Sequence, residues 1–171
     1  MTPVFHVIET AATPLWDFGW FDLTRFRIEA SVAERHDALG LLRAFLRDPI
    51  SQRSFCDPGR WGLSVGRHGP FLREKLAADS IRPLSTSELA NRLRAALEDP
   101  QFTSPPTPAQ RRPVEAWLEL VRTRGDTAFE LAVPDASDSR VEWSYVWLVF
   151  HEFLCFSPER EELAVAVIGY D

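Results

Sequence analysis

The sequence has few cysteines and no apolar run long enough to cross a membrane. Only Cys56 and Cys155 are present, far apart and outside any CxxC pair, so the spacing of a zinc ribbon is absent. The first ten residues, MTPVFHVIET, lack the basic stretch and apolar core of a secretory signal. No apolar run approaches the ~18 residues of a membrane helix. We therefore expect a cytoplasmic protein with reduced thiols, no membrane partner, no cofactor and no metal.

The sequence also lacks an excess of positive charge. It contains 19 Lys and Arg against 25 Asp and Glu, which gives a formal net charge of −6. Because contacts with phosphates require a basic surface, nucleic acid is disfavoured as the main ligand. Six arginines between positions 92 and 124 form a local basic cluster, which is typical of solvated helix faces.

Length and composition predict a single folded domain over residues 1–171. Apolar residues make up 45% of the chain and aromatic residues 12%, which is incompatible with a disordered protein. A chain of this length buries about two thirds of its unfolded surface, so it needs neither disulfides nor a metal to fold. We find no internal repeat and no low-complexity segment.

Two segments carry the Ser-x-x-Glu pattern of a helix capping box. In residues 31–34 (SVAE) and 85–88 (STSE), the hydroxyl accepts from the third helical amide and the carboxylate reaches back to the cap amide. Apolar residues follow both segments at helical spacing. The sequence predicts that the first helix ends before Pro49 and the second at Asp99 and Pro100.

A third helix is predicted between Thr107 and Gly125. Thr107 is a suitable N-cap, and Gly125 is a natural residue for the left-handed turn that ends a helix. Pro113 complicates this segment, because a proline at the sixth helical position clashes with the preceding turn. Either the helix starts near Arg112, or the first turn is separate from the rest.

Alternating apolar residues predict strands at both ends of the chain. Residues 4–8 form a short β-like run that Pro14 ends, and residues 16–28 alternate with a bulge near Gly19. Residues 127–133 alternate as well. The fold class that follows is α+β, with an antiparallel sheet of four to six strands and three main helices packed mostly on one side.

Residues 143–156 are apolar on both faces, as in a central strand that is covered on both sides. The polar segment SPERE predicts a turn, and residues 163–168 then predict a second strand. The chain therefore ends in an antiparallel β-hairpin.

The segment HEFLC at residues 151–155 is not a metal site. It differs from HExxH, whose two His stack on one face of a helix. On a strand, His151 and Glu152 point to opposite faces, and His151 lies roughly 13 Å from Cys155. We expect Cys155 to be a small buried hydrophobic residue and His151 to lie at the edge of the core. A Cys–His nucleophile formed with a distant histidine stays open.

Glu152 is the unusual residue of this strand. It lies between Phe150 and Leu154 on a covered face, where a carboxylate is costly unless it is paired. It pairs with an arginine, lies at the margin of the sheet, or lines a pocket together with His151. The last interpretation predicts a small enzyme or small-molecule-binding protein with a pocket between sheet and helices.

Two groups of residues are candidates for a partner-binding surface. Trp16, Asp17 and Trp20 combine aromatic rings with an acid, which is the composition of an interaction hot spot as well as of a core. The second group is acidic and is typical of a solvated hairpin tip or of a surface that steers a basic partner: Glu159, Glu161, Glu162 and Asp171.

The acidic segment SPEREE, the closing strand LAVAVIGYD and the lack of a catalytic motif resemble, in general type only, bacterial immunity proteins. Such proteins neutralise toxins, among them nucleases, by docking an acidic surface. The resemblance implies a non-enzymatic protein-binding module whose partner is a basic toxin. The other interpretations are the small enzyme above and a homodimer that pairs through an exposed sheet edge.

Overall fold

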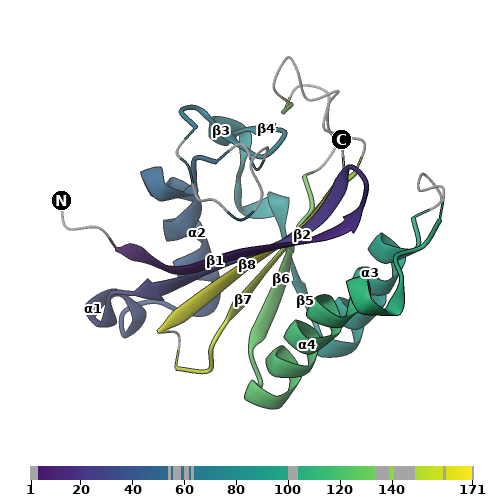
Figure 1. Cartoon of the computed structure of the whole chain (residues 1–171). Coiled ribbons are helices and arrows are strands. Elements are labelled where there is room, and N and C mark those ends of the chain that lie inside the picture. The colour runs from purple at the N-terminus through teal and green to yellow at the C-terminus, as the bar shows by residue number, and fades with distance from the viewer. Residues whose placement is uncertain are drawn as a thin grey trace.

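The computed structural model of the chain (Figure 1) describes residues 4–53, 55, 59, 62, 64–99, 104–133, 139–140, 149–159 and 161–170. Six strands form one antiparallel sheet in the order β1-β2-β8-β7-β6-β5. The strands are β1 (Phe5–Trp16), β2 (Gly19–Ile28), β5 (Ile81–Leu84), β6 (Thr127–Leu131), β7 (Val149–Phe156) and β8 (Glu162–Tyr170). Strand β8 is the last of these strands in the sequence, yet it lies in the middle of the sheet.

The main helices divide between the two faces of this sheet (Figure 1). Helices α3 (Thr86–Leu97) and α4 (Pro108–Arg124) cover one face, and α2 (Ala38–Arg47) covers the other. We call these the α3/α4 face and the α2 face. The remaining elements are short: α1 (Ala30–Ala33), the 3-10 turns η1 (Pro49–Ser51), η2 (Arg73–Lys75) and η3 (Ala78–Ser80), and the two-stranded hairpin β3 (Arg67–His68) with β4 (Phe71–Leu72). The predicted α+β class with a C-terminal hairpin is confirmed.

Strand β8 shows why the sheet is buried on both sides. Leu163, Val165 and Val167 pack into the core of the α2 face and are fully buried. Ala164 and Ile168, on alternate positions, pack under α3 and α4. Because successive side chains of a strand point to opposite faces, an unbroken apolar run places one residue in each core in turn.

The caps of α3 and α4 are confirmed. The Ser85 hydroxyl accepts from the Glu88 amide while the Glu88 carboxylate accepts from the Ser85 amide, and Thr107 and Gln110 repeat the arrangement. Both predictions for Pro113 are wrong, because α4 runs through it as one helix. The proline removes a single backbone donor, and the capping box holds the first turn in place.

The cap predicted at residues 31–34 is also wrong. Helix α1 has no side-chain cap and ends at Ala33, and the amphipathic helix begins again as α2. Asp37 is its N-cap, with the carboxylate accepting from the Gly40 amide at 2.7 Å. Aspartate and serine are equally good N-cap residues, so Ser31 and Asp37, six residues apart, are both suitable starts for this helix. The sequence pattern alone does not choose between them.

Strand β1 is longer than predicted and continues through Pro14 to Trp16. A proline is tolerated there because β1 is an edge strand, and among the described residues no further strand pairs with its outer side. The register is irregular at two places in β1, between Val7 and Glu9 and between Pro14 and Trp16. The second lies opposite Trp20 and Gly19, so the bulge predicted near Gly19 is present there, with its extra residue on β1. The first part of the predicted strand 143–156 lies outside the described residues.

Within the part of the chain that the structure describes, no helix is both long and apolar enough to span a membrane.

The two candidate caps give a direct test of the helix start. We expect Asp37→Ala to lower the free energy of unfolding by about 1 kcal/mol, because the Gly40 amide loses its acceptor. Ser31→Ala should leave it within about 0.5 kcal/mol, since that hydroxyl caps nothing. Urea denaturation followed by circular dichroism measures both. A larger loss from Ser31→Ala than from Asp37→Ala would contradict this assignment.

Candidate functional site

Two carboxylates lie in one row across the α2 face of the sheet. Asp22 on β2 and Glu152 on β7 are each paired in register with Val167 of β8, from opposite sides. Two strand spacings place their backbones about 10 Å apart. Both side chains are buried, with 1% and 0% exposure. Because a buried carboxylate without a partner is very costly, each requires a counter-charge.

Arg53 is the counter-charge of Asp22. Its guanidinium donates to both carboxylate oxygens, at 3.0 and 2.9 Å, and one of the same nitrogens lies 3.3 Å from the Thr24 hydroxyl. The Gly59 amide donates to Asp22 Oδ2 at 2.7 Å, and the guanidinium lies over the Phe55 ring at 4.5 Å. The pair thus has the two parallel hydrogen bonds that fit a guanidinium to a carboxylate.

His68 is the counter-charge of Glu152. Its Nε2 lies 2.8 Å from both carboxylate oxygens, and its Nδ1 lies 2.5 Å from the Ser51 carbonyl oxygen. Burial lowers the pKa of His68, but the charge of Glu152 and the hydrogen bonds to Glu152 and Ser51 outweigh it, so the pKa is raised overall. A protonated ring donates from both nitrogens, so a carbonyl on one side and a carboxylate on the other favour the charged form of His68.

The two pairs are joined through the backbone, and we call the four residues Asp22, Arg53, His68 and Glu152 the ionic layer. Arg53 and His68 form a parallel bridge, and the Gly69 amide donates to the Arg53 carbonyl at 2.7 Å. All four side chains are at most 1% exposed. A layer so enclosed leaves no room for a substrate, and its evident effect is to hold the segment after α2 against the sheet.

The structure does not bring Glu152 and His151 into one pocket. They point to opposite faces, and the partner of Glu152 is a histidine, where the sequence suggested an arginine. Burial lowers the pKa of His151, although the charges of Glu130 and Asp99 act in the other direction. The partner, His68, ends the short strand β3 in the segment GRHGP, and its pairing depends on tertiary contacts that no local pattern indicates.

The thiol of Cys155 is buried beneath α3 and α4, at 1% exposure, and is not in a disulfide. Burial raises its pKa well above the usual range, which disfavours the thiolate that a nucleophile requires. Cys56 lies outside the described residues. Among those that the structure does describe, no group of three or more His, Cys, Asp and Glu side chains has the arrangement of a metal site.

The turn between β1 and β2 borders a hollow of about 240 Å³, which we call the aromatic hollow. Trp16 and Tyr170 contact edge to face, with 6.2 Å between ring centroids, and the indole Nε1 donates to the Ser104 carbonyl at 3.0 Å. Phe18 stands at the tip of the turn with 64% of its surface exposed. The hollow is lined by Leu15, Trp16, Asp17, Phe18, Ser104, Pro105, Thr107, Gln110 and Tyr170.

Gly19 allows these rings to lie close to the backbone. A β-carbon at this position would lie 2.4 Å from the Trp16 ring and 2.9 Å from the Tyr170 ring, which is closer than atoms pack. Any larger residue would push the Trp16 indole outward. The position of the Trp16 and Tyr170 rings therefore depends on Gly19, the residue near which the sequence predicted a bulge.

The acidic residues of the β7–β8 turn lie beside arginines. Glu162 accepts from Arg25 at 3.0 and 2.7 Å and from Arg124 at 3.1 Å, and these hydrogen bonds, that of Arg25 most, lower its pKa. Glu159 and Glu161 are exposed and line a hollow of about 610 Å³ with the same two arginines. The turn is therefore a mixed ionic surface and not a purely acidic one.

The predicted partner-binding residues do not form one surface. Trp16 and Asp17 line the aromatic hollow, whereas Trp20 is buried in the core of the α2 face. Glu162 begins β8 and Tyr170 ends it, so the acidic turn and the aromatic hollow lie at opposite ends of that strand, about 27 Å apart. Asp171 lies outside the described residues.

Comparison with known proteins assigns no family. No protein-family model matches the chain, and no curated protein matches its sequence. Two crystal forms of citrus MAF1 are similar in structure. The form in space group P 31 2 1 is 11% identical with a TM-score of 0.47 over 92% of both chains, and the form in C 2 2 21 is 10% identical with a TM-score of 0.40 over 90% of both. A likeness with TM-scores below 0.5 assigns no function to this chain.

The ionic layer makes stability depend on pH through His68. The unfolded ring titrates near pH 6.5 and the folded ring higher, so between these values the folded state holds more protons. The stabilisation is complete below about pH 6.5 and is lost as pH rises through the folded pKa. We expect the stability advantage of the native protein over His68→Gln to shrink over that range, as measured by urea denaturation. An advantage that grows with pH would contradict a charged His68.

The other half of the layer predicts a large loss of stability. Arg53→Met leaves Asp22 buried without a counter-charge, which costs about 3–5 kcal/mol of the free energy of unfolding. Arg27→Met removes an exposed arginine from β2 and should cost less than about 0.5 kcal/mol. Denaturant unfolding measures the loss for both variants. Equal losses of unfolding free energy from Arg53→Met and Arg27→Met would show that the pair of Arg53 with Asp22 does not stabilise the fold.

Proposed function

We propose that this chain is a non-enzymatic binding module that recognises another protein through its aromatic hollow. One observation carries the proposal: Phe18 is 64% exposed at the tip of a two-residue turn, beside a hollow lined by Trp16 and Tyr170. A large exposed ring beside a preformed recess is the arrangement of an interface anchor, because most binding energy at interfaces comes from a few aromatic side chains in well-packed pockets.

The size of the hollow favours a protein over a small ligand. At about 240 Å³ it lies below the range of roughly 300–1,000 Å³ that is usual for small-molecule sites, yet it accommodates one large side chain of a partner. The indole of Trp16 is already held by Ser104 and Tyr170, so little rotamer entropy remains to be lost on binding.

The ionisable groups support a non-enzymatic role. Glu152 and His68 bond to each other at full burial, and the Cys155 thiol is buried beneath helices. Among the described residues that line the aromatic hollow, Asp17 is the only one with a carboxylate. The alternative enzyme, with a pocket built on Glu152 and His151, loses its support because the two side chains lie on opposite faces of the sheet.

Charge supports a basic partner. The formal net charge of −6 attracts a basic protein at long range, and Asp17 places an acid at the rim of the hollow. Glu159 and Glu161 lie at the other end of β8, so they speed the encounter without contacting the partner. A cytoplasmic immunity protein that neutralises a basic toxin is the specific form of this proposal.

A homodimer through β1 is the second candidate. This edge strand exposes Val7 at 40% and Ile8 at 44%. The register irregularities and Pro14 interrupt its outer edge, which is how edge strands avoid pairing. Sedimentation at several protein concentrations distinguishes a dimer from a monomer.

The experiment places a photo-crosslinking amino acid at position 18 and, as the control, at position 120. Leu120 is an exposed apolar residue of α4, at 44%. We expect position 18 to capture one basic protein from lysate and position 120 not to. With that protein purified, Phe18→Ala should weaken binding by about 10- to 30-fold, and Leu120→Ala by less than twofold.

Reversing the charge of Glu159 and Glu161 tests whether they attract the partner at long range or contact it in the complex. We expect Glu159→Lys with Glu161→Lys to slow association and to reduce its salt dependence, with little change in the dissociation rate. Equal effects of Phe18→Ala and Leu120→Ala would overturn the assignment of the hollow. A salt-independent association rate would overturn the basic partner.

A further inference from the structure

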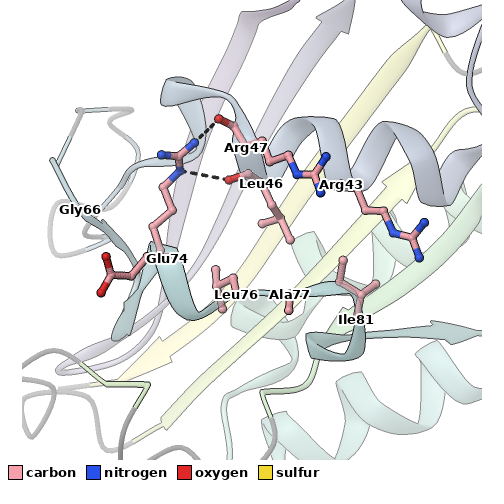
Figure 2. A pocket seen from close by; sticks show the side chains of 9 residues that line it. Arg43, Leu46, Arg47, Gly66, Glu74, Leu76, Ala77 and Ile81 are labelled. Atoms are coloured by element: carbon pink, nitrogen blue, oxygen red, sulfur yellow. Dashed lines mark hydrogen bonds between the residues drawn. The ribbon is translucent and has the colours of Figure 1, made fainter.

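A third cavity, of about 470 Å³, lies on the α2 side of the molecule between the end of α2 and the segment that leads into β5 (Figure 2). Three of its lining residues are arginines, Arg43, Arg47 and Arg73, against a single acid, Glu74. In a protein with a formal net charge of −6, such a concentration of positive charge is unexpected. It lies apart from the aromatic hollow and shares no residue with it.

Arg73 is held in place by the helix that it borders. Its Nε donates to the Leu46 carbonyl at 3.1 Å, and one terminal nitrogen donates to the Arg47 carbonyl, so it also caps the C-terminus of α2. The side chain is therefore fixed before any ligand arrives. Its other terminal nitrogen makes no hydrogen bond to any residue that the structure describes.

Arg43 and Arg47 lie one helical turn apart on α2, where like charges repel each other. Both side chains are exposed, and in the described parts of the chain no carboxylate or carbonyl oxygen pairs with either. Figure 2 shows both guanidinium groups extending from the helix over the side where Ala77 and Ile81 lie, while the carboxylate of Glu74 lies at the other end.

The floor of the cavity is apolar. Leu46 from α2, Leu76 from the loop after η2 and Ile81 at the start of β5 line it beneath the arginines. Ile81 is 7% exposed and Leu46 is 7% exposed, so both are fixed by the core behind them. The cavity thus offers positive charge on one side and apolar surface on the other.

We propose that this cavity binds a small organic molecule that carries a phosphate monoester. The phosphate would lie between Arg43 and Arg47, and its apolar body on Leu46 and Ile81, while Arg73 holds the end of α2 beside them. The two guanidinium groups of Arg43 and Arg47 carry a charge of +2, which matches the −1.5 to −2 of a phosphate monoester at pH 7. A planar guanidinium fits phosphate oxygens with paired hydrogen bonds. The volume lies in the range that is usual for small-molecule sites.

Phosphate is favoured over a carboxylate by this charge balance, and a small molecule over a peptide by the volume of the cavity. A monocarboxylate would leave one of the two positive charges unmatched. Binding would also relieve the repulsion between Arg43 and Arg47 and would bridge α2 to the segment before β5. Because the unfolded chain has no such cavity, the ligand should stabilise the native protein.

The test uses phenyl phosphate, benzoate and inorganic phosphate as probes of the intact protein at low ionic strength. Titrations followed by amide chemical shifts and by thermal unfolding give the affinity and the location of binding. We expect saturable binding of phenyl phosphate, with shifts confined to α2 and residues 66–81 and a raised Tm. Benzoate and inorganic phosphate should each bind at least tenfold more weakly, because benzoate carries only a single negative charge and inorganic phosphate lacks the apolar body.

Arg43→Gln and Arg47→Gln should each weaken phenyl phosphate binding by about tenfold or more and leave the Tm of the free protein unchanged or higher. Arg112→Gln is the matched control, since Arg112 is an exposed arginine on α4 that lines neither this cavity nor the aromatic hollow. An equal loss from Arg112→Gln would show that net charge alone attracts the anion and would overturn the site. So would the absence of saturation at millimolar ligand, or inorganic phosphate that binds as tightly as phenyl phosphate.

Discussion

The α2 face depends on two buried ion pairs that join the sheet to the segment between α2 and β5. Asp22 and Glu152 are intolerable in a sheet core on their own, so the segment that carries Arg53 and His68 must fold over them. Once it does, the backbone bridge between Arg53 and His68 fixes the β3–β4 hairpin. Buried pairs of this kind rarely add much net stability over apolar residues. Their effect is that only one placement of an otherwise irregular segment satisfies all four charges.

Local patterns predicted the elements whose causes are local. The caps at Ser85 and Thr107 use hydrogen bonds within three residues, and the apolar run of β8 follows from burial on both faces. Local patterns failed at residues 31–34, because Asp37, six residues after Ser31, is an equally good N-cap. They also failed at Pro113, where the loss of one backbone hydrogen-bond donor costs less than a continuous helix gains. Strand β1 passed through Pro14 because an edge position removes the penalty.

The candidate sites could be predicted only in part, because they depend on contacts between distant parts of the chain. The cost of burying Glu152 was evident from its neighbours, but His68 lies 84 positions away. Trp16 and Trp20 are close in sequence, yet one borders the hollow and the other fills the core, since four residues across a turn change the face. The arginine cavity gave no local signal: Arg43 and Arg47 look like an ordinary solvated helix face until Arg73 and the segment before β5 are placed beside them.

The central position of β8 has a consequence for how the protein forms during synthesis. The β1–β2 hairpin is translated early, but its inner edge pairs with β8, and so does the inner edge of β7. At ordinary rates of elongation, β2 waits on the order of ten seconds for its partner. During that interval the edge of β2 that later pairs with β8 is unpaired on the ribosome, and β2 is rich in aromatic residues. The charged residues Arg25 and Arg27 of β2, with Glu29 directly after the strand, then oppose pairing with a neighbouring nascent chain.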